Sequence, residues 1–121
     1  MIKGILVTVT DEIKVVDVDT TSVGEESPNS LQAHVKGWIE MVRPRGLPDH
    51  FMFVCNEEGK LLNLKPNFVG TVLYGCTQDY IAGDILICKE DYGNDGVEIV
   101  DMCQEEMELL LGVLNLIAKA K

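Results

Sequence analysis

Apolar residues recur along this chain in two periods, and the periods predict its secondary structure. Ile2–Thr10 and Ile13–Val18 alternate and are rich in β-branched residues, with an acidic turn between them, which is typical of a hairpin of two strands. Trp38–Arg43 and Phe51–Asn56 carry large apolar residues and predict a second pair of strands. The first half of the chain is therefore expected to contribute two strand pairs.

The second pair is bounded by residues that do not suit the interior of a strand. Pro44–Asp49 contains two prolines and a glycine and predicts the connecting loop. Glu57–Lys60 predicts a tight turn in which Gly59 takes a positive φ. Leu61–Leu64 can extend the second strand beyond that turn.

One short helix is expected before the second pair. Asp19–Ser30 is polar and indicates an exposed loop. Asn29 or Ser30 at its end can cap a helix that runs to about Lys36. Gly37 would follow this helix, at a position where a left-handed residue is favoured.

Shorter apolar segments follow in the second half. Phe68–Tyr74 is apolar but interrupted by a glycine, so its pattern fits either a helix or a strand. Gly75–Asp79 is expected to be a loop and Ile85–Lys89 a short strand. Val97–Val100 can form a last strand after an Asn-Asp-Gly turn signal.

A long C-terminal helix is the clearest element of the pattern. Asp101 and Gln104 have the spacing of a capping box, glutamates follow in the first turn, and lysines stand in the last. The helix carries two apolar stripes: Met107, Leu110, Leu111, Leu114 and Ile117 on one face, and Leu109, Val113 and Leu116 on another. A helix that covers a small sheet needs only one such stripe. The second stripe indicates a homo-oligomer formed through this helix, or else a deep groove that buries both stripes within one monomer.

These elements predict an α+β fold in which a mainly antiparallel sheet is combined with one short helix and a long C-terminal helix. The 121 residues fit a single domain, 1–121, and 46% hydrophobic residues suffice for a core. The longest apolar runs are too short to span a membrane or to serve as a signal sequence, so we expect a cytoplasmic protein.

The net charge of the chain limits the classes of partner that it can bind. A net charge of −10 disfavours nucleic acid and anionic membranes. It permits a basic protein partner, or a mimic of nucleic acid that occupies a DNA-binding protein. The four cysteines are widely spaced and form no Cys-x-x-Cys pair, which favours small buried side chains over a metal site or a redox motif.

Signatures of catalysis are lacking in the sequence. It has no phosphate-binding glycine loop, nucleophile elbow or zinc-binding His-Glu-x-x-His motif. His50 and Cys55 have an odd separation, which would place them on opposite faces of one strand. We therefore expect no enzymatic activity, no metal and no cofactor.

The strongest candidates for function are Arg43 and Arg45, the only two arginines, which flank Pro44. Guanidinium groups bind phosphate oxygens through paired hydrogen bonds, and the proline restricts their positions. The alternative is that both arginines form surface ion pairs with nearby acids.

Further side chains could bind the rest of a nucleotide. Phe68 and Tyr80 border polar loops and could stack on a base, although ordinary core packing is the alternative for both. Asn56, Thr77 and Gln78 could hydrogen-bond a purine edge or ribose hydroxyls. For Asn56, capping of the adjacent turn is the alternative.

Several segments resemble a family of uncharacterised small domains found in phages, mobile elements and gut bacteria. They are Met1–Val7, Gly37–Val42, the Val-Cys-Asn-Glu-Glu-Gly-Lys-Leu segment Val54–Leu61, Ile81–Ile87, and Val100 with Asp101 before the terminal helix. This resemblance covers most of the chain and implies the same layout of elements, but it implies no activity, because the family has none assigned.

In size and organisation the chain also resembles the Thoeris anti-defence proteins of the Tad1 type. That resemblance implies a non-enzymatic homo-oligomer that binds and sequesters a cyclic ADP-ribose isomer in the cytoplasm of the host cell. The competing hypothesis is an acidic protein-binding module or DNA mimic that inhibits a host defence enzyme. It rests on the net charge and on acids such as Glu25 and Glu26.

Overall fold

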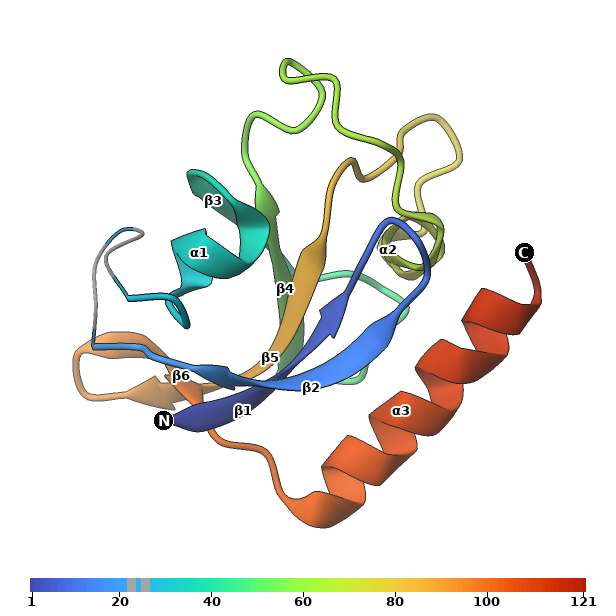
Figure 1. Cartoon of the computed structure of the whole chain (residues 1–121). Coiled ribbons are helices and arrows are strands. Elements are labelled where there is room, and N and C mark those ends of the chain that lie inside the picture. Colours follow the sequence, from blue (N-terminus) through green and yellow to red (C-terminus); the bar gives the residue numbers. More distant parts are fainter. Residues whose placement is uncertain (22–23, 25–26) are drawn as a thin grey trace.

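The computed structural model describes residues 1–21, 24 and 27–121 (Figure 1). Most of the predicted Asp19–Ser30 loop is described, but its positions 22, 23, 25 and 26, which include Glu25 and Glu26, lie outside the described residues. The N-terminal hairpin is confirmed: β1 (Ile2–Val7) pairs antiparallel with β2 (Ile13–Val18).

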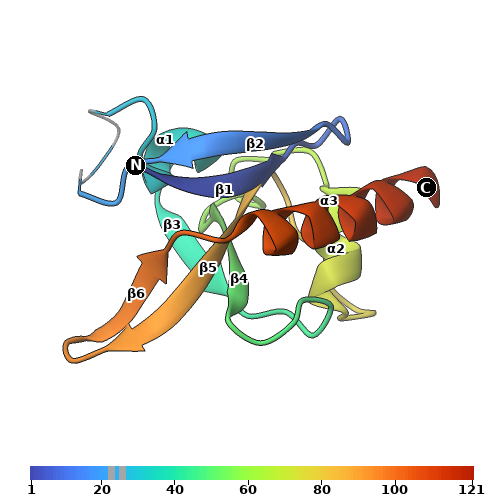
Figure 2. The ribbon, with the colours of Figure 1, turned by 90° about the horizontal axis from the view of Figure 1, so that it is seen from below.

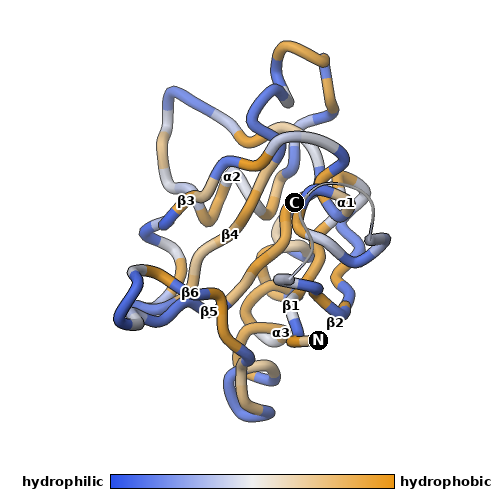
Figure 3. Tube along the Cα trace, turned by 90° about the vertical axis from the view of Figure 1, so that its left-hand side faces the viewer, coloured by the Kyte–Doolittle hydropathy of each residue, from blue (hydrophilic) through white to orange (hydrophobic). Residues whose placement is uncertain are grey.

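The other strands complete an antiparallel sheet of six strands around β5. The second predicted pair is confirmed as β3 (Ile39–Val42) and β4 (Phe51–Asn56). β5 (Ile85–Gly93) pairs with β1, β4 and β6 (Gly96–Val100), and the order is β2-β1-β5-β4-β3 with β6 off this path. The β5–β6 hairpin projects from the rest of the molecule, and its tip is hydrophilic (Figures 2 and 3).

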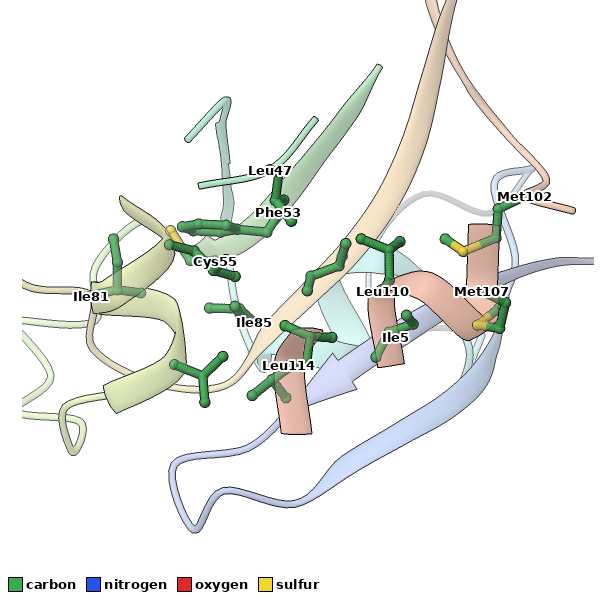
Figure 4. Packing of buried hydrophobic residues seen from close by; sticks show 14 residues of the cluster. Ile5, Leu47, Phe53, Cys55, Ile81, Ile85, Met102, Met107, Leu110 and Leu114 are labelled. Atoms are coloured by element: carbon green, nitrogen blue, oxygen red, sulfur yellow. The ribbon is translucent and has the colours of Figure 1, made fainter. Parts of the chain in front are cut away.

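Strand alternation separates two apolar faces of this sheet. One buried cluster contains Ile5, Val7, Phe53, Cys55, Ile85 and Ile87, and it is shown in Figure 4. The other contains Val18, Met52, Val54, Leu86 and Cys88. Both faces need a cover, because a sheet buries its apolar side chains only against another layer.

Helices supply these covers, and the described chain has three of them. α2 (Phe68–Tyr74) and α3 (Gln104–Lys119) pack on the first cluster through Val69, Leu73, Met107, Leu110 and Leu114. α1 (Leu31–Val35) lies against β4 and β5, and its Leu31 packs on the second cluster. The α+β class with a mainly antiparallel sheet and a C-terminal helix is confirmed, whereas the expectation of one short helix is wrong.

The ends of the short helices correct several local predictions. Ser30 caps α1 by accepting the N–H of Ala33 at 3.1 Å. The left-handed residue after α1 is Lys36, at φ 64°, and not Gly37. Gly37 is needed for a different reason, because a Cβ there would lie 2.7 Å from the side-chain nitrogen of Asn56.

The ambiguous segment Phe68–Tyr74 is a helix because residues on both sides of it act as caps. The Asn67 side chain accepts the N–H of Gly70 at 2.9 Å and donates to two carbonyls, those of Val7 and Gly83, at 3.0 Å each. Gly75 ends the helix with a φ of 76°. This buried amide therefore ties α2 to β1.

The segment after β4 is a series of turns, so the predicted strand extension over Leu61–Leu64 is wrong. Asn63 has the positive φ in this segment, at 55°, and Gly59 does not. Gly59 instead allows a close approach, since a Cβ there would lie 2.7 Å from the carbonyl oxygen of Ala82.

The capping box of α3 lies two residues later than predicted. Glu106 accepts the N–H of Cys103 at 2.9 Å, and Cys103 is the residue that precedes the helix. Asp101 is committed elsewhere, because its carboxylate accepts the backbone N–H of Lys3 at 2.9 Å and that of Met102 at 3.1 Å. Asp101 therefore joins the β6–α3 connection to β1.

Candidate functional site

Two loops meet at the end of α2 and form the candidate site. The loop after β3 is docked there by a hydrogen bond from the N–H of Gly46 to the carbonyl of Leu73 at 3.0 Å. A Cβ on Gly46 would lie 2.9 Å from the Cα and the oxygen of Leu73, so only glycine permits this approach. The loop that follows α2 begins at Gly75. Because both loops are fixed at the same helix end, their side chains face a common space.

That space is a hollow of about 550 Å³ with an unusual charge for this protein. It is lined by Arg43, Pro44, Arg45, Tyr74, Gly75, Cys76, Thr77 and Gln78. Among the residues that the structure describes, this lining includes both arginines and no carboxylate. The rest of this article calls it the arginine hollow.

Arg43 is held in place by Glu90 of β5. Its Nε donates to Oε1 of Glu90 at 2.7 Å, and its Nη2 donates to Oε2 at 2.9 Å. The Glu90 side chain is only 5% exposed, whereas that of Arg43 is 50% exposed. The hydrogen bonds to Glu90 and its charge raise the pKa of Arg43. The predicted alternative of an ion pair thus holds for Arg43, but with a buried partner instead of a surface acid.

Arg45 differs from Arg43 in its surroundings. It is exposed, and within the part of the chain that the structure describes it has no ion-pair or hydrogen-bond partner. Its Cβ lies 4.0 Å from the position that a Cβ on Gly75 would occupy. All five N–H donors of Arg45 are therefore available beside the loop that carries Thr77 and Gln78.

A second hollow of about 420 Å³ adjoins the first and shares Arg43 and Tyr74 with it. It contains Tyr80, which is 43% exposed and has Nζ of Lys60 over one face of its ring, 4.8 Å from the ring centroid. Lys60 also forms an ion pair with Asp79, and this hydrogen bond raises the pKa of Lys60 and lowers that of Asp79. The second hollow is therefore mixed in charge, unlike the arginine hollow.

Two of the predicted site residues have a role in the fold, although Asn56 also lines the second hollow. The Asn56 side chain is buried, donates to the carbonyl of Val35 at 3.2 Å and accepts the N–H of Glu58 at 2.8 Å. It thus caps the turn after β4, which is the alternative that the sequence left open, and it also holds the end of α1 through Val35. Phe68 is half-buried and packs on the first apolar cluster, and it lines neither hollow.

The C-terminus of α2 lies at the arginine hollow. Its partial negative charge would repel an anion bound there. Two hydrogen bonds reduce this effect. Gly75 donates to the carbonyl of Thr71 at 3.2 Å, and Gly46 donates to that of Leu73. The charge of Arg43 is offset by Glu90, whereas Arg45 has no ion-pair partner among the described residues, so Arg45 supplies most of the positive field against this helix of seven residues.

Neither cysteine of the sheet is a candidate nucleophile. Burial, with a smaller contribution from Glu40, raises the pKa of the Cys55 thiol to about 11, and burial raises that of Cys88 to about 12. Within residues 1–21, 24 and 27–121, no three His, Cys, Asp or Glu side chains are grouped so as to hold a metal ion. Nor does a helix in these ranges have the length and apolar character to cross a bilayer.

Comparison with protein families shows which family this chain belongs to. The model of a domain of unknown function, DUF3846, matches residues 2–112. The chain belongs to the DUF3846 family. No curated protein and no solved structure matches it. The expected membership in a family of small domains of unknown function is confirmed, and the link to Thoeris anti-defence stays a prediction.

Three side chains of this DUF3846 domain were missed from the sequence. Tyr74 lines both hollows, and Lys60 brings a cation to the second. Glu90 positions Arg43 from 47 residues away. An acid next to an apolar strand is a signal for Glu90, but its partner follows only from the pairing of β5 with β4.

Proposed function

We propose that this DUF3846 domain binds a small nucleotide of the cyclic ADP-ribose type and holds it without chemical change. The observation that carries the proposal is the composition of the arginine hollow. The chain has twenty acidic and ten basic residues, yet the described lining of this hollow has both arginines and no acid. A site for a pyrophosphate needs such a local excess of positive charge.

The two arginines would have different roles on the phosphates. Arg45 has no partner among the described residues, which leaves its guanidinium fork for two phosphate oxygens. Arg43 has two nitrogens engaged by Glu90, so its remaining N–H groups would be presented in a fixed direction. A guanidinium that is already ordered loses less entropy on binding, which favours high affinity.

The remaining parts of a nucleotide would find partners in the loop that follows α2. The hydroxyl of Thr77 and the amide of Gln78 line the arginine hollow and can bind ribose hydroxyls or a base edge. Tyr80 offers one ring face to a base, because Lys60 covers the other. Hollows of about 420 and 550 Å³ fall within the range typical of small-molecule sites.

Sequestration is the function that this binding would serve. It rests on the resemblance to Thoeris anti-defence proteins, which act in the cytoplasm of the host cell and keep a signal nucleotide from its effector. The ligand class that the resemblance implies agrees in chemistry with the arginine hollow.

Isothermal titration with cyclic ADP-ribose isomers tests the proposal, followed by chromatography of the ligand recovered from the cell. We expect at least one isomer to bind and to be recovered intact. Arg45→Ala should weaken binding strongly, whereas the matched control Lys65→Ala should not. Lys65 is an exposed cation outside both hollows. No heat with any isomer would refute nucleotide binding, and cleaved ligand would refute sequestration.

The acidic-mimic hypothesis makes a different prediction in the same preparation. A DNA-binding host protein should then be captured by the domain, and Arg45→Ala should not affect the capture. That outcome, together with a flat titration, would replace the nucleotide proposal.

A further inference from the structure

Helix α3 exposes an apolar stripe on the side away from the sheet. Leu109 is 64% exposed, Val113 38% and Leu116 70%, while Met107, Leu110 and Leu114 of the same helix are buried. The three exposed side chains, called here the outer stripe, follow helical spacing and form one continuous face. The prediction that both stripes are buried in a deep groove of one monomer is therefore wrong.

Two ionic side chains stand at the ends of the outer stripe. Glu105 precedes Leu109 by one helical turn, and Lys119 follows Leu116 by three residues. Both are exposed, and among the described residues neither has an ion-pair or hydrogen-bond partner. The neighbouring ions are already engaged, since Glu106 pairs with Lys89 and Lys121 pairs with Asp11.

This distribution of charge is complementary to itself when the helix is reversed. We propose that the outer stripe binds the outer stripe of a second copy of the chain, with the two α3 helices antiparallel about a two-fold axis. In that arrangement Leu109 lies opposite the partner's Leu116, and Val113 lies near the axis. Glu105 then lies within one residue of the level of the partner's Lys119, so two equivalent ion pairs close the ends.

A parallel arrangement is disfavoured by the same charges. It would place Glu105 beside its own copy at one end and Lys119 beside its own copy at the other, and like charges repel at both ends. The antiparallel arrangement converts both repulsions into attractions.

The glycine at the centre of the stripe agrees with a close helix pair. A Cβ on Gly112 would meet no described atom within 4 Å beyond its chain neighbours and the adjacent backbone of its own helix, so no described contact within the monomer requires glycine there. Glycine in a helix interior lowers helix propensity. It permits a second backbone to approach closely, which a larger side chain at the centre would prevent.

This interface does not depend on the nucleotide proposal. Its six residues line neither the arginine hollow nor the second hollow, so either inference can fail alone.

Sedimentation and light scattering of the full chain test the interface across a range of concentrations. We expect a dimer that dissociates on dilution. Leu116→Glu should weaken it by about a hundredfold or more, because each dimer would bury two unpaired carboxylates. Leu62→Glu is the matched control, since Leu62 is 56% exposed but lies in the turns after β4. A monomeric mass at every concentration, or a dimer insensitive to Leu116→Glu, would overturn the proposal.

Charge reversal tests the antiparallel direction. Glu105→Lys alone and Lys119→Glu alone should each weaken the dimer by about tenfold at low salt, because two pairs become two repulsions. The double variant restores both attractions in the antiparallel pair, so its dissociation constant should return to that of the wild type. Failure of the double variant to recover would overturn the antiparallel arrangement, and circular dichroism of each variant verifies that α3 is intact.

Discussion

Removal of the Arg43 side chain should destabilise this protein, whereas removal of Arg45 should not. Arg43→Ala leaves the Glu90 carboxylate, 5% exposed, without its two charge-assisted hydrogen bonds. Breaking a fully buried pair costs about 3–5 kcal/mol. The Arg43 side chain is half exposed, so water can partly replace it, and we expect a loss of about 2 kcal/mol.

That loss is large enough to measure by two methods. A chain of this size changes its melting temperature by about 4 °C per kcal/mol, so Arg43→Ala should melt about 8 °C lower than the wild type. Arg45→Ala should shift the free energy of unfolding by less than about 0.5 kcal/mol, the usual range for an exposed side chain. Urea denaturation gives the same comparison as a free energy of unfolding.

A double-mutant cycle isolates the pair. Glu90→Gln removes the buried charge, so adding it to Arg43→Ala should cost less than it does in the wild type. We expect a coupling energy of about 1.5 kcal/mol between the two positions. Equal melting temperatures for Arg43→Ala and Arg45→Ala, or a coupling energy below about 0.5 kcal/mol, would refute the reasoning.

Three further results are expected. The hydrogen bond from the N–H of Cys103, followed in size by the one from the Lys89 side chain, lowers the pKa of Glu106 from 4.5 to about 2. The ionised Glu106 therefore stabilises the fold fully above about pH 4.5, and this contribution is lost as pH falls towards 2. The melting temperatures of wild type and Glu106→Gln should differ at neutral pH and converge on acidification. Nucleotide should slow thiol labelling of Cys76, which lines the arginine hollow, but not of Cys103, which is also exposed and lies outside it. Equal rates at Cys76 with and without ligand would contradict this. Gly46→Ala should weaken nucleotide binding measured by titration, because its Cβ would meet Leu73 at 2.9 Å and displace the loop.

Local pattern was sufficient for elements whose stability is decided by neighbours in sequence. Alternation in Ile2–Thr10 and Ile13–Val18 specified a hairpin, since a strand with one buried face reveals its period directly. The helix over Phe68–Tyr74 could also have been predicted from local sequence, because Asn67 and Gly75 are the residues that cap its two ends. The apolar pattern alone left it undecided.

The candidate site was only partly predictable, because it depends on contacts between distant segments. Arg43 and Arg45 stood out by their rarity, and the structure places both in one hollow with Thr77 and Gln78. The partner of Arg43 could not be foreseen, since the sequence does not give the strand order that brings Glu90 beside it.

The sequence also left open the role of side chains that suit either a ligand or the fold. Asn56 has the groups to bind a nucleotide, but its buried position commits them to Val35 and to the turn at Glu58. Phe68 has the ring for stacking, but α2 directs it to the core.

The most direct test of the account is a nuclear magnetic resonance titration of ¹⁵N-labelled protein with each cyclic ADP-ribose isomer in turn. It reports both binding and its location in a chain of 13.4 kDa. We predict that the largest changes occur at Nε of Arg45 and at the amides of residues 75–78, with none along α3. Saturable binding whose changes lie outside the arginine hollow, or no change at any concentration, would contradict the account.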